Sequence, residues 1–152
     1  MKKYISILLV IVAILSVCAC YDLDRYPEDK INTNTFWKTQ QHAEQGINAI
    51  YAMFQNYYIF GSYFSLDCLG EVGTGYGEHG NENISRGTYN SLDNRILNRW
   101  TYLYEGVARA NLAIQNIPKI HATDSEIATL MGEAKFLRSL FYFYLTDFFG
   151  GV

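Results

Sequence analysis

The sequence predicts an all-α protein whose helices pack as antiparallel pairs. Three stretches, at about 40–57, 93–116 and 124–149, repeat apolar residues at spacings of three and four, the period of one helix face. No run of alternating apolar and polar residues speaks strongly for a strand. Helix-start and helix-stop residues flank these stretches. Together these observations favour helix-on-helix packing.

Residues 1–19 have the layout of a secretory signal peptide. A basic start precedes an apolar run at 5–15, which is too short to span a bilayer. The run leads to Cys20, which resembles the lipidated cysteine of a bacterial lipobox because the small Ala19 precedes it. We therefore expect export and a lipid tether at Cys20. An ordinary cleaved signal and an uncleaved anchor are the alternatives.

Composition restricts the class of partner. Removing residues 1–19 removes two lysines and no acid, so ten basic residues face fifteen acidic ones and the formal charge becomes −5. A chain this acidic has no electrostatic reason to bind nucleic acid or anionic lipid. Once Cys18 is removed and Cys20 is lipidated, Cys68 has no partner for an intrachain disulfide. Stability must then come from packing.

Residues 20–35 read as a tether, because their Asp, Asn and Pro residues are typical of loops. A first helix is expected from about Gln40 to Tyr57, with Thr39 as its N-cap. Gly46 inside it suggests a close neighbouring helix. The apolar stripe of this helix comprises Ala43, Ile47, Ile50, Tyr51, Phe54 and Tyr58.

Residues 60–92 are expected to form a long loop, because seven glycines interrupt any helical period. A loop of this length is usually functional or disordered. Its aromatic residues favour function, since a disordered linker gains nothing from them. Across the whole chain, 13 tyrosines and 9 phenylalanines are expected mostly to fill the seams between helices.

A second helix is expected from about Asp93 to Asn116, with Pro118 at or beyond its end. Asn111 falls within its apolar stripe, so buried hydrogen-bond partners are expected for that side chain. The stripe comprises Trp100, Leu103, Tyr104, Val107, Ala108, Asn111 and Ile114.

The third helix begins at a capping box, in which Thr123 and Glu126 satisfy each other's backbone. The glycines at 150–151 supply its stop. Glu133 and Arg138 are expected to make structural ion pairs with adjacent helices. The apolar stripe comprises Ile127, Leu130, Met131, Ala134, Leu137, Phe141, Tyr144, Leu145 and Phe148.

Several motifs carry no chemistry. The G-x-G-x-x-G match at 75–80 lies in a polar loop without the strand and helix that a dinucleotide site needs. The acids, Cys68 and His79 of the same loop lack the spacing of a zinc or calcium site. No serine or cysteine has an evident partner base, so nothing supports an enzyme. We expect no cofactor and no metal.

Several segments together resemble SusD/RagB proteins. The stretch 132–143, GEAKFLRSLFYF, is similar to the family's G-E-A-R-F-L-R-A-x-x-Y-F helix, and 149–152, FGGV, to its F-G-G-V-P. Trp100, the Ala-Asn pair at 110–111, the lipobox and the Asp-Leu-Asp-x-x-Pro stretch at 22–27 also fit. Lys135 and Ser139 are mild departures from the pattern. The match covers nearly all of residues 20–152.

The resemblance implies a mostly helical, TPR-like fold. It also implies an outer-membrane lipoprotein with a non-enzymatic role. Such proteins bind a glycan, or sometimes a peptide, at the cell surface and pass it to a SusC-like TonB-dependent transporter. A peptide-binding lid and a structural scaffold without its own ligand are the alternatives. Family members are longer, so residues 36–152 are expected to be an N-terminal helical region that is truncated at the C-terminus.

Within that resemblance, the loop after the first helix supplies part of the ligand site. Tyr76 and Tyr89 are the expected stacking platforms for sugar rings. Asn81, Asn83 and Arg86 are the expected polar contacts to hydroxyl groups. The loop contains no tryptophan, which argues against starch and leaves the glycan open. The alternative is that these residues only shape the loop.

Overall fold

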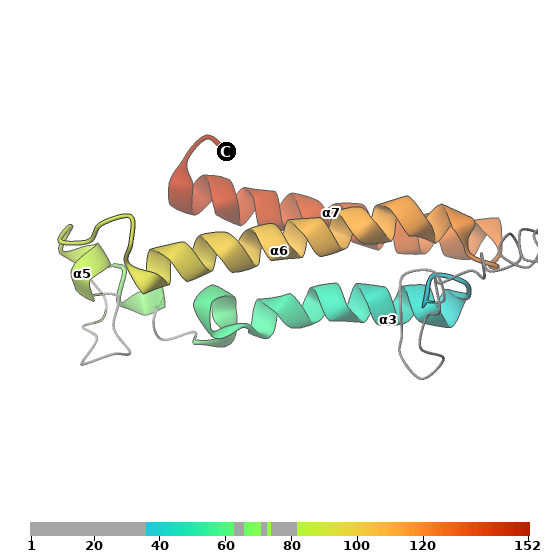
Figure 1. The fold of residues 1–152 in the computed structure, drawn as a ribbon, viewed down its shortest axis with the longest axis horizontal. Helices are drawn as coiled ribbons and strands as arrows, with labels where there is room; N and C mark the ends of the chain where they lie inside the picture. The colour runs from blue at the N-terminus through green and yellow to red at the C-terminus, as the bar shows by residue number, and fades with distance from the viewer. Residues whose placement is uncertain (1–35, 63–65, 71–72, 74–81) are drawn as a thin grey trace, which may run out of the picture. The chain divides into compact units, whose positions relative to one another are not determined.

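The computed structural model describes residues 36–62, 66–70, 73 and 82–152, which lie within one compact unit, Asn34–Val152. Its long helices are α3 (Gln40–Tyr51), α6 (Asn94–Asn116) and α7 (Asp124–Phe149). As Figure 1 shows, α6 runs antiparallel to both α3 and α7. The expected all-α fold of packed helix pairs is therefore confirmed. The short elements are η1 (Ala52–Gln55), η2 (Tyr57–Gly61), α5 (Glu82–Ser85) and η4 (Ile117–Lys119).

Two expectations fall outside the described residues. Residues 1–35 are not described, and they include the expected signal peptide at 1–19, the expected lipidation site Cys20 and the expected tether at 20–35. In the described residues, no helix has the length and apolar character that crossing a membrane requires.

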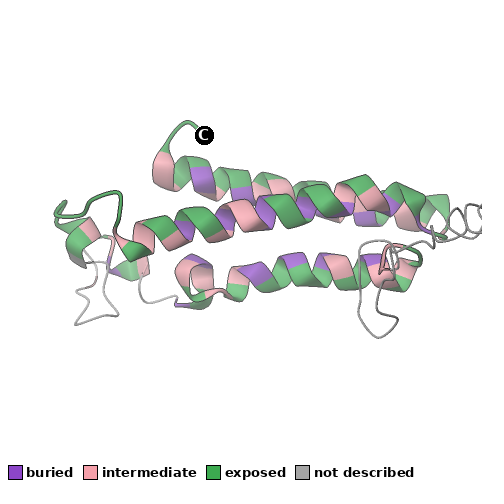
Figure 2. Ribbon diagram, viewed as in Figure 1, coloured by how far each residue is buried: buried purple, intermediate pink, exposed green. Residues whose placement is uncertain are grey.

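One hydrophobic core lies between the three long helices, and buried positions follow one side of each helix (Figure 2). The third-helix stripe is confirmed, because each of its members is buried or half-buried. In the other two helices, the expected Tyr51, Trp100 and Ala108 are exposed instead. The largest fully buried side chains are Phe141, Ile47, Ile50, Leu103, Ile117, Leu137 and Leu145.

The first helix starts where expected and ends earlier. The Thr39 hydroxyl accepts the backbone N–H of His42, which confirms the N-cap. The α-helix stops at Tyr51, and the chain continues as η1 before Asn56 adopts an extended conformation. The Asn56 side chain accepts the Tyr58 N–H at 2.9 Å, a local turn that competes with the helix. The expected extent, to Tyr57, is therefore wrong.

Gly46 is explained by a different neighbour from the one expected. A Cβ at Gly46 would lie 2.4 Å from Cη2 of Trp37, which belongs to the segment before α3. The close contact is therefore made by an indole ring and not by an adjacent helix. The same segment also contacts the connection between η4 and α7, because the His121 N–H donates to the Lys38 carbonyl at 2.9 Å.

The second helix matches its expected extent, and Asp93 caps it by accepting the Arg95 N–H at 2.9 Å. The burial expected for Asn111 is wrong, since that residue is exposed. Its Oδ1 accepts a hydrogen bond from Arg138 of α7 at 3.0 Å. Arg138 thus links two helices as expected, but through an amide, so the ion pair expected of it is wrong at this contact.

The capping box of α7 is confirmed. The Thr123 hydroxyl accepts the Glu126 N–H, and the Glu126 carboxylate accepts the Thr123 N–H at 2.8 Å. At the other end, Gly150 caps the helix with a φ of 81°, a left-handed conformation that favours glycine. The expected boundaries of the third helix are therefore confirmed at both ends.

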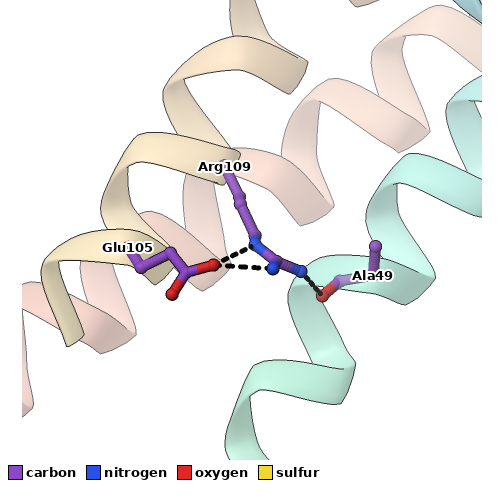
Figure 3. A network of polar contacts seen from close by, with 3 residues as sticks. All are labelled: Ala49, Glu105 and Arg109. Atoms are coloured by element: carbon purple, nitrogen blue, oxygen red, sulfur yellow. Dashed lines mark hydrogen bonds and ion pairs between the residues drawn. The ribbon is translucent and has the colours of Figure 1, made fainter. Parts of the chain in front are cut away.

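Polar contacts also join α3 to α6 at the surface (Figure 3). Arg109 is held by Glu105 of its own helix, with Nη2 at 2.7 Å from Oε1. Its Nη1 donates to the Ala49 carbonyl of α3 at 3.3 Å. Since these side chains are solvated, we expect the contact to orient the helices more than to stabilise them.

Many rings fill the helix seams, as expected. Phe54 stacks on Phe141 with centroids 4.5 Å apart and planes within 6°. Phe60 meets Tyr144 edge-on at 4.6 Å. These rings pack the segment after α3 against α7, and such pairs add to the burial of their apolar area.

Candidate functional site

A cavity of about 280 Å³ lies where α6 begins and α7 ends. Two arginines and a tyrosine supply its polar groups, and aliphatic and aromatic side chains supply the rest of its wall. This mixture of an apolar wall with a few convergent polar groups is typical of small-ligand sites. The lining residues are Leu69, Ile84, Tyr89, Arg95, Ile96, Arg99, Phe148 and Phe149.

Arg99 is the most constrained polar side chain of the cavity, with 8% of its surface exposed. Its Nε donates to the Tyr58 carbonyl at 2.9 Å. Its Cζ lies 4.1 Å from the centroid of the Phe148 ring, a cation–π geometry. Two elements far apart in the sequence therefore fix the plane of this guanidinium.

The electrostatics of Arg99 are unusual. Burial is the main cause that lowers the pKa of Arg99 to about 10, and the positive charge of Arg95, one turn earlier on α6, lowers it further. The guanidinium still carries its charge near neutral pH. Both arginines line the cavity, and they belong to a chain whose formal net charge is −3.

The turn after α3 positions the partner of Arg99. Asn56 lies between η1 and η2 and redirects the chain, and its carbonyl accepts the Ile59 and Gly61 N–H groups, both at 2.9 Å. A Cβ at Gly61 would lie 2.1 Å from the Gln55 carbonyl oxygen, so this turn needs a glycine. The result is a Tyr58 carbonyl directed at Arg99.

The expected site residues separate into three groups. Tyr89 lines the cavity, with 51% of its surface exposed. Asn83 and Arg86 are exposed, and neither is among the lining residues. The Asn83 carbonyl accepts the Thr88 N–H at 2.9 Å, so its backbone shapes the loop. Tyr76 and Asn81 lie outside the described residues.

Sequence reasoning missed Arg95, Arg99, Phe148 and Phe149. A signal for Arg99 was present, because it lies four residues before the buried Leu103 and therefore on the buried face of the helix. The predicted apolar stripe of the second helix began at Trp100 instead. The Trp100 ring packs edge-on against Phe149 at 5.0 Å, and Trp100 is exposed. No local sequence pattern predicts that the end of α7 lies beside the start of α6.

A larger cavity of about 410 Å³ lies along α3 and α7, and it is a weaker candidate. Its charged groups are the carboxylates Glu44, Glu126 and Glu133. Two of them already have partners, since Glu44 accepts from Gln40 at 2.9 Å and Glu126 belongs to the capping box. Glu44 and Glu126 therefore make hydrogen bonds within or at the start of their own helices.

Metal and nucleophilic chemistry find no support in the described part of the chain. There, no three His, Cys, Asp or Glu side chains gather as a metal site requires. Cys68 is buried, and His42 stacks on the Phe36 ring with centroids 5.3 Å apart. Glu71, Glu78 and His79 of the acidic loop, and the glycines at 75–80, lie outside the described residues.

Comparison with known proteins finds similarity to SusD-like proteins. A family model of SusD-like proteins, described as starch-binding and associating with the outer membrane, matches residues 21–152. SusD-like protein P2 of Formosa agariphila is 26% identical over 160 residues, and SusD-like protein P38 of the same organism is 29% identical over 161. Each alignment covers 100% of this chain and 31% of the relative.

A solved structure agrees with the sequence matches. A SusD homolog from Bacteroides thetaiotaomicron superposes with a TM-score of 0.65 at 26% identity, covering 79% of this chain and 24% of that one. The chain spans about a third of the length of the curated relatives it matches. Because the family model matches most of the sequence and the helices superpose on those of a SusD homolog, the chain belongs to the SusD-like family of outer-membrane-associated, starch-binding proteins.

Proposed function

We propose that this chain is part of a surface lipoprotein that captures a glycan and delivers it to a SusC-like TonB-dependent transporter. The family match supports a glycan-binding, outer-membrane role. The observation that carries the assignment to this chain is the cavity in which Tyr89 and two arginines converge on an apolar wall. The role is one of binding, without catalysis.

Sugar rings suit such a site. They present flat C–H faces, which aromatic side chains cover, and a rim of hydroxyl groups, which polar side chains bind. Tyr89 has an exposed ring at the mouth of the cavity. Tyr76 is proposed as a second stacking platform, with Asn81, Asn83 and Arg86 as polar contacts from the same loop.

Binding is tested with a glycan array and a peptide pool probed in parallel with the purified protein. A glycan that binds, and whose affinity falls in Tyr89→Ala and Tyr76→Ala, supports the proposal. Tyr51→Ala is the matched control, because Tyr51 is also an exposed tyrosine but belongs to α3. Binding of peptides alone would instead favour the peptide-binding lid.

Location and partner need a separate experiment on whole cells. Cys20→Ser is expected to prevent lipidation. The protein should then be lost from the membrane fraction and be recovered in the soluble fraction without detergent. Affinity purification of the unaltered protein should recover a large TonB-dependent β-barrel. Recovery of that barrel from a protein that binds no glycan would favour a scaffold without its own ligand.

A further inference from the structure

We infer that the ligand site extends beyond the cavity to the exposed ring of Trp100, so that the captured glycan is an oligosaccharide whose sugar units contact Tyr89 and Trp100 together. The inference rests on the proposed glycan-binding function and deepens it, because it assigns a second sugar-binding position and restricts the ligand to chains of several sugars. Three observations lead to it: the size of the cavity, a ring that joins the two positions, and the way in which the Trp100 ring is held.

The cavity is small for a chain of sugars. Its volume of about 280 Å³ lies just below the range of about 300–1,000 Å³ that is typical of sites for small ligands. It therefore encloses only a short part of a glycan, and the rest of a bound oligosaccharide lies on the surface beside it. An aromatic surface that borders the cavity is then a direct continuation of the site.

Phe149 joins the cavity to Trp100. It is one of the lining residues, and its ring centroid lies 5.0 Å from that of Trp100 with the planes 86° apart. The preceding residue of each helix makes a similar contact, since Cζ of Arg99 lies 4.1 Å from the centroid of the Phe148 ring. Two consecutive residues near the start of α6 thus contact the last two residues of α7. Trp100 therefore lies directly beside the cavity.

The Trp100 ring is held in place without being covered. Tyr104, one turn later on α6, contacts it with ring centroids 4.7 Å apart, and Phe149 contacts it edge-on. Even so, 40% of the surface of Trp100 is exposed. A large ring that its neighbours already orient loses little conformational freedom when a ligand stacks on it. Tryptophan is also enriched among the residues that contribute most to binding at interfaces.

Polar donors lie beside these rings, as binding of a sugar requires. Arg99 lines the cavity and is buried, and its Nε donates to the Tyr58 carbonyl at 2.9 Å. In the part of the chain that the structure describes, no hydrogen bond uses the two Nη atoms of Arg99. Buried donors without partners are costly, so these groups suit oxygen atoms of a ligand. Sugar hydroxyl groups are such acceptors, and the C–H faces of the same sugars suit the neighbouring rings.

The exposed rings of Phe136 and Phe143 differ from Trp100 in their surroundings. Each is 62% exposed, but neither lines the cavity, and within the described chain neither ring contacts the ring of a lining residue. An exposed apolar face of this kind suits another protein surface. A ring that borders a cavity with unused donors suits an amphipathic ligand such as a sugar. Trp100 is therefore assigned to the ligand site.

The experiment compares short ligands with long ones. Disaccharides and hexasaccharides of the maltose, cellobiose, xylobiose and mannobiose series are titrated into the protein as produced from its own gene. At least one hexasaccharide should bind about threefold to tenfold more tightly than its disaccharide, the range for one added aromatic contact. Trp100→Ala should remove most of that gain and leave the affinity for the disaccharide unchanged. Phe136→Ala, which removes an exposed ring from α7, should change neither affinity.

Fluorescence reports on the Trp100 ring itself and does not depend on removing it. The sequence contains two tryptophans. The other, Trp37, belongs to the segment that contacts the connection after η4 through Lys38, at the opposite end of α6 from Trp100. In Trp37→Phe, a saturating hexasaccharide should shift the emission of Trp100 and lower its quenching by acrylamide. In Trp100→Phe, the emission and quenching of Trp37 should not change.

Two results would overturn the inference while leaving the glycan-binding function intact. One is a hexasaccharide that binds no more tightly than its disaccharide, or whose gain in affinity survives in Trp100→Ala. The other is unchanged quenching of Trp100 in the saturated Trp37→Phe protein, which would place the ring outside the site. If no sugar of this panel and no glycan of the array binds, the proposed function fails, and the inference fails with it.

Discussion

Gly106 of α6 lies directly against the ring of Phe141 of α7. A Cβ at Gly106 would be 2.4 Å from two carbon atoms of that ring, and Phe141 is fully buried, so the ring has no space to withdraw. Gly106→Ala is expected to cost about 1–3 kcal/mol by overpacking, against a gain of about 1 kcal/mol in helix propensity. Chemical denaturation should therefore show a net loss of stability.

Gly132 supplies the matched control. It also lies inside a long helix, but an added Cβ there would meet nothing within 4 Å. Gly132→Ala is expected to raise the free energy of unfolding by roughly 0.5–1 kcal/mol, because alanine is the better helix former. Opposite signs for the two substitutions would support the α6–α7 packing, and equal signs would contradict it.

The capping box at the start of α7 offers a second test. Thr123→Ala removes the hydroxyl that accepts the Glu126 N–H and should cost about 1 kcal/mol of unfolding free energy. Thr123→Ser keeps that hydroxyl and should recover most of the loss. Denaturant midpoints of the three proteins measure the effect. A serine variant as unstable as the alanine variant would assign the loss to the threonine methyl group.

Stability should also depend on pH through Glu126. Hydrogen bonds from Thr123, first from the hydroxyl and then from the backbone N–H, lower the pKa of Glu126 below its ordinary value of 4.5. Because the folded pKa is the lower one, this contribution is fully present above about pH 4.5 and is lost as pH falls through the folded pKa.

Glu126→Gln isolates this effect. The difference in unfolding free energy between the native protein and the variant should be largest near neutral pH and should shrink as pH falls below 4.5. In a Thr123→Ala background the same substitution should matter less, since the hydroxyl partner is gone. A difference that grows on acidification would contradict the assigned role of Glu126.

The sequence predicted the long helices well, because their caps and periods are local. The capping box of Thr123 and Glu126 and the stop at Gly150 both depend on residues within one or two turns. The end of α3 was misjudged, since Asn56 lies within an apolar pattern and its turn competes with the helix only through its side chain. Periodicity alone does not report such competition.

The candidate site was predicted less well, because it depends on tertiary contacts. Tyr89 was predicted as a ligand contact because the family resemblance places part of the ligand site in its loop, and Tyr89 lines the cavity. Arg99 was missed, because its partners Tyr58 and Phe148 are 41 and 49 positions away in the sequence. Charged residues inside helical stripes are therefore worth examining as site residues when no acidic neighbour explains them.

Exposed aromatic residues predict the behaviour of residues 20–152 in isolation. Phe136 and Phe143 of α7 are each 62% exposed and lie seven residues apart, on one face of the helix. Leu112 of α6 is exposed as well. Exposed apolar side chains that lie close together favour association in water. We expect this chain alone to be poorly soluble or oligomeric when its mass is measured by light scattering.

Substitution of the two phenylalanines tests which surface drives that association. Phe136→Ser combined with Phe143→Ser should shift the chain toward monomers, because it removes the paired rings while leaving the buried face of α7 intact. Leu92→Ser is the control, since Leu92 is more exposed but precedes α6 and lies off this face. A sharp, cooperative unfolding transition of the unaltered chain as a monomer would contradict the prediction, because the exposed rings would then need no partner.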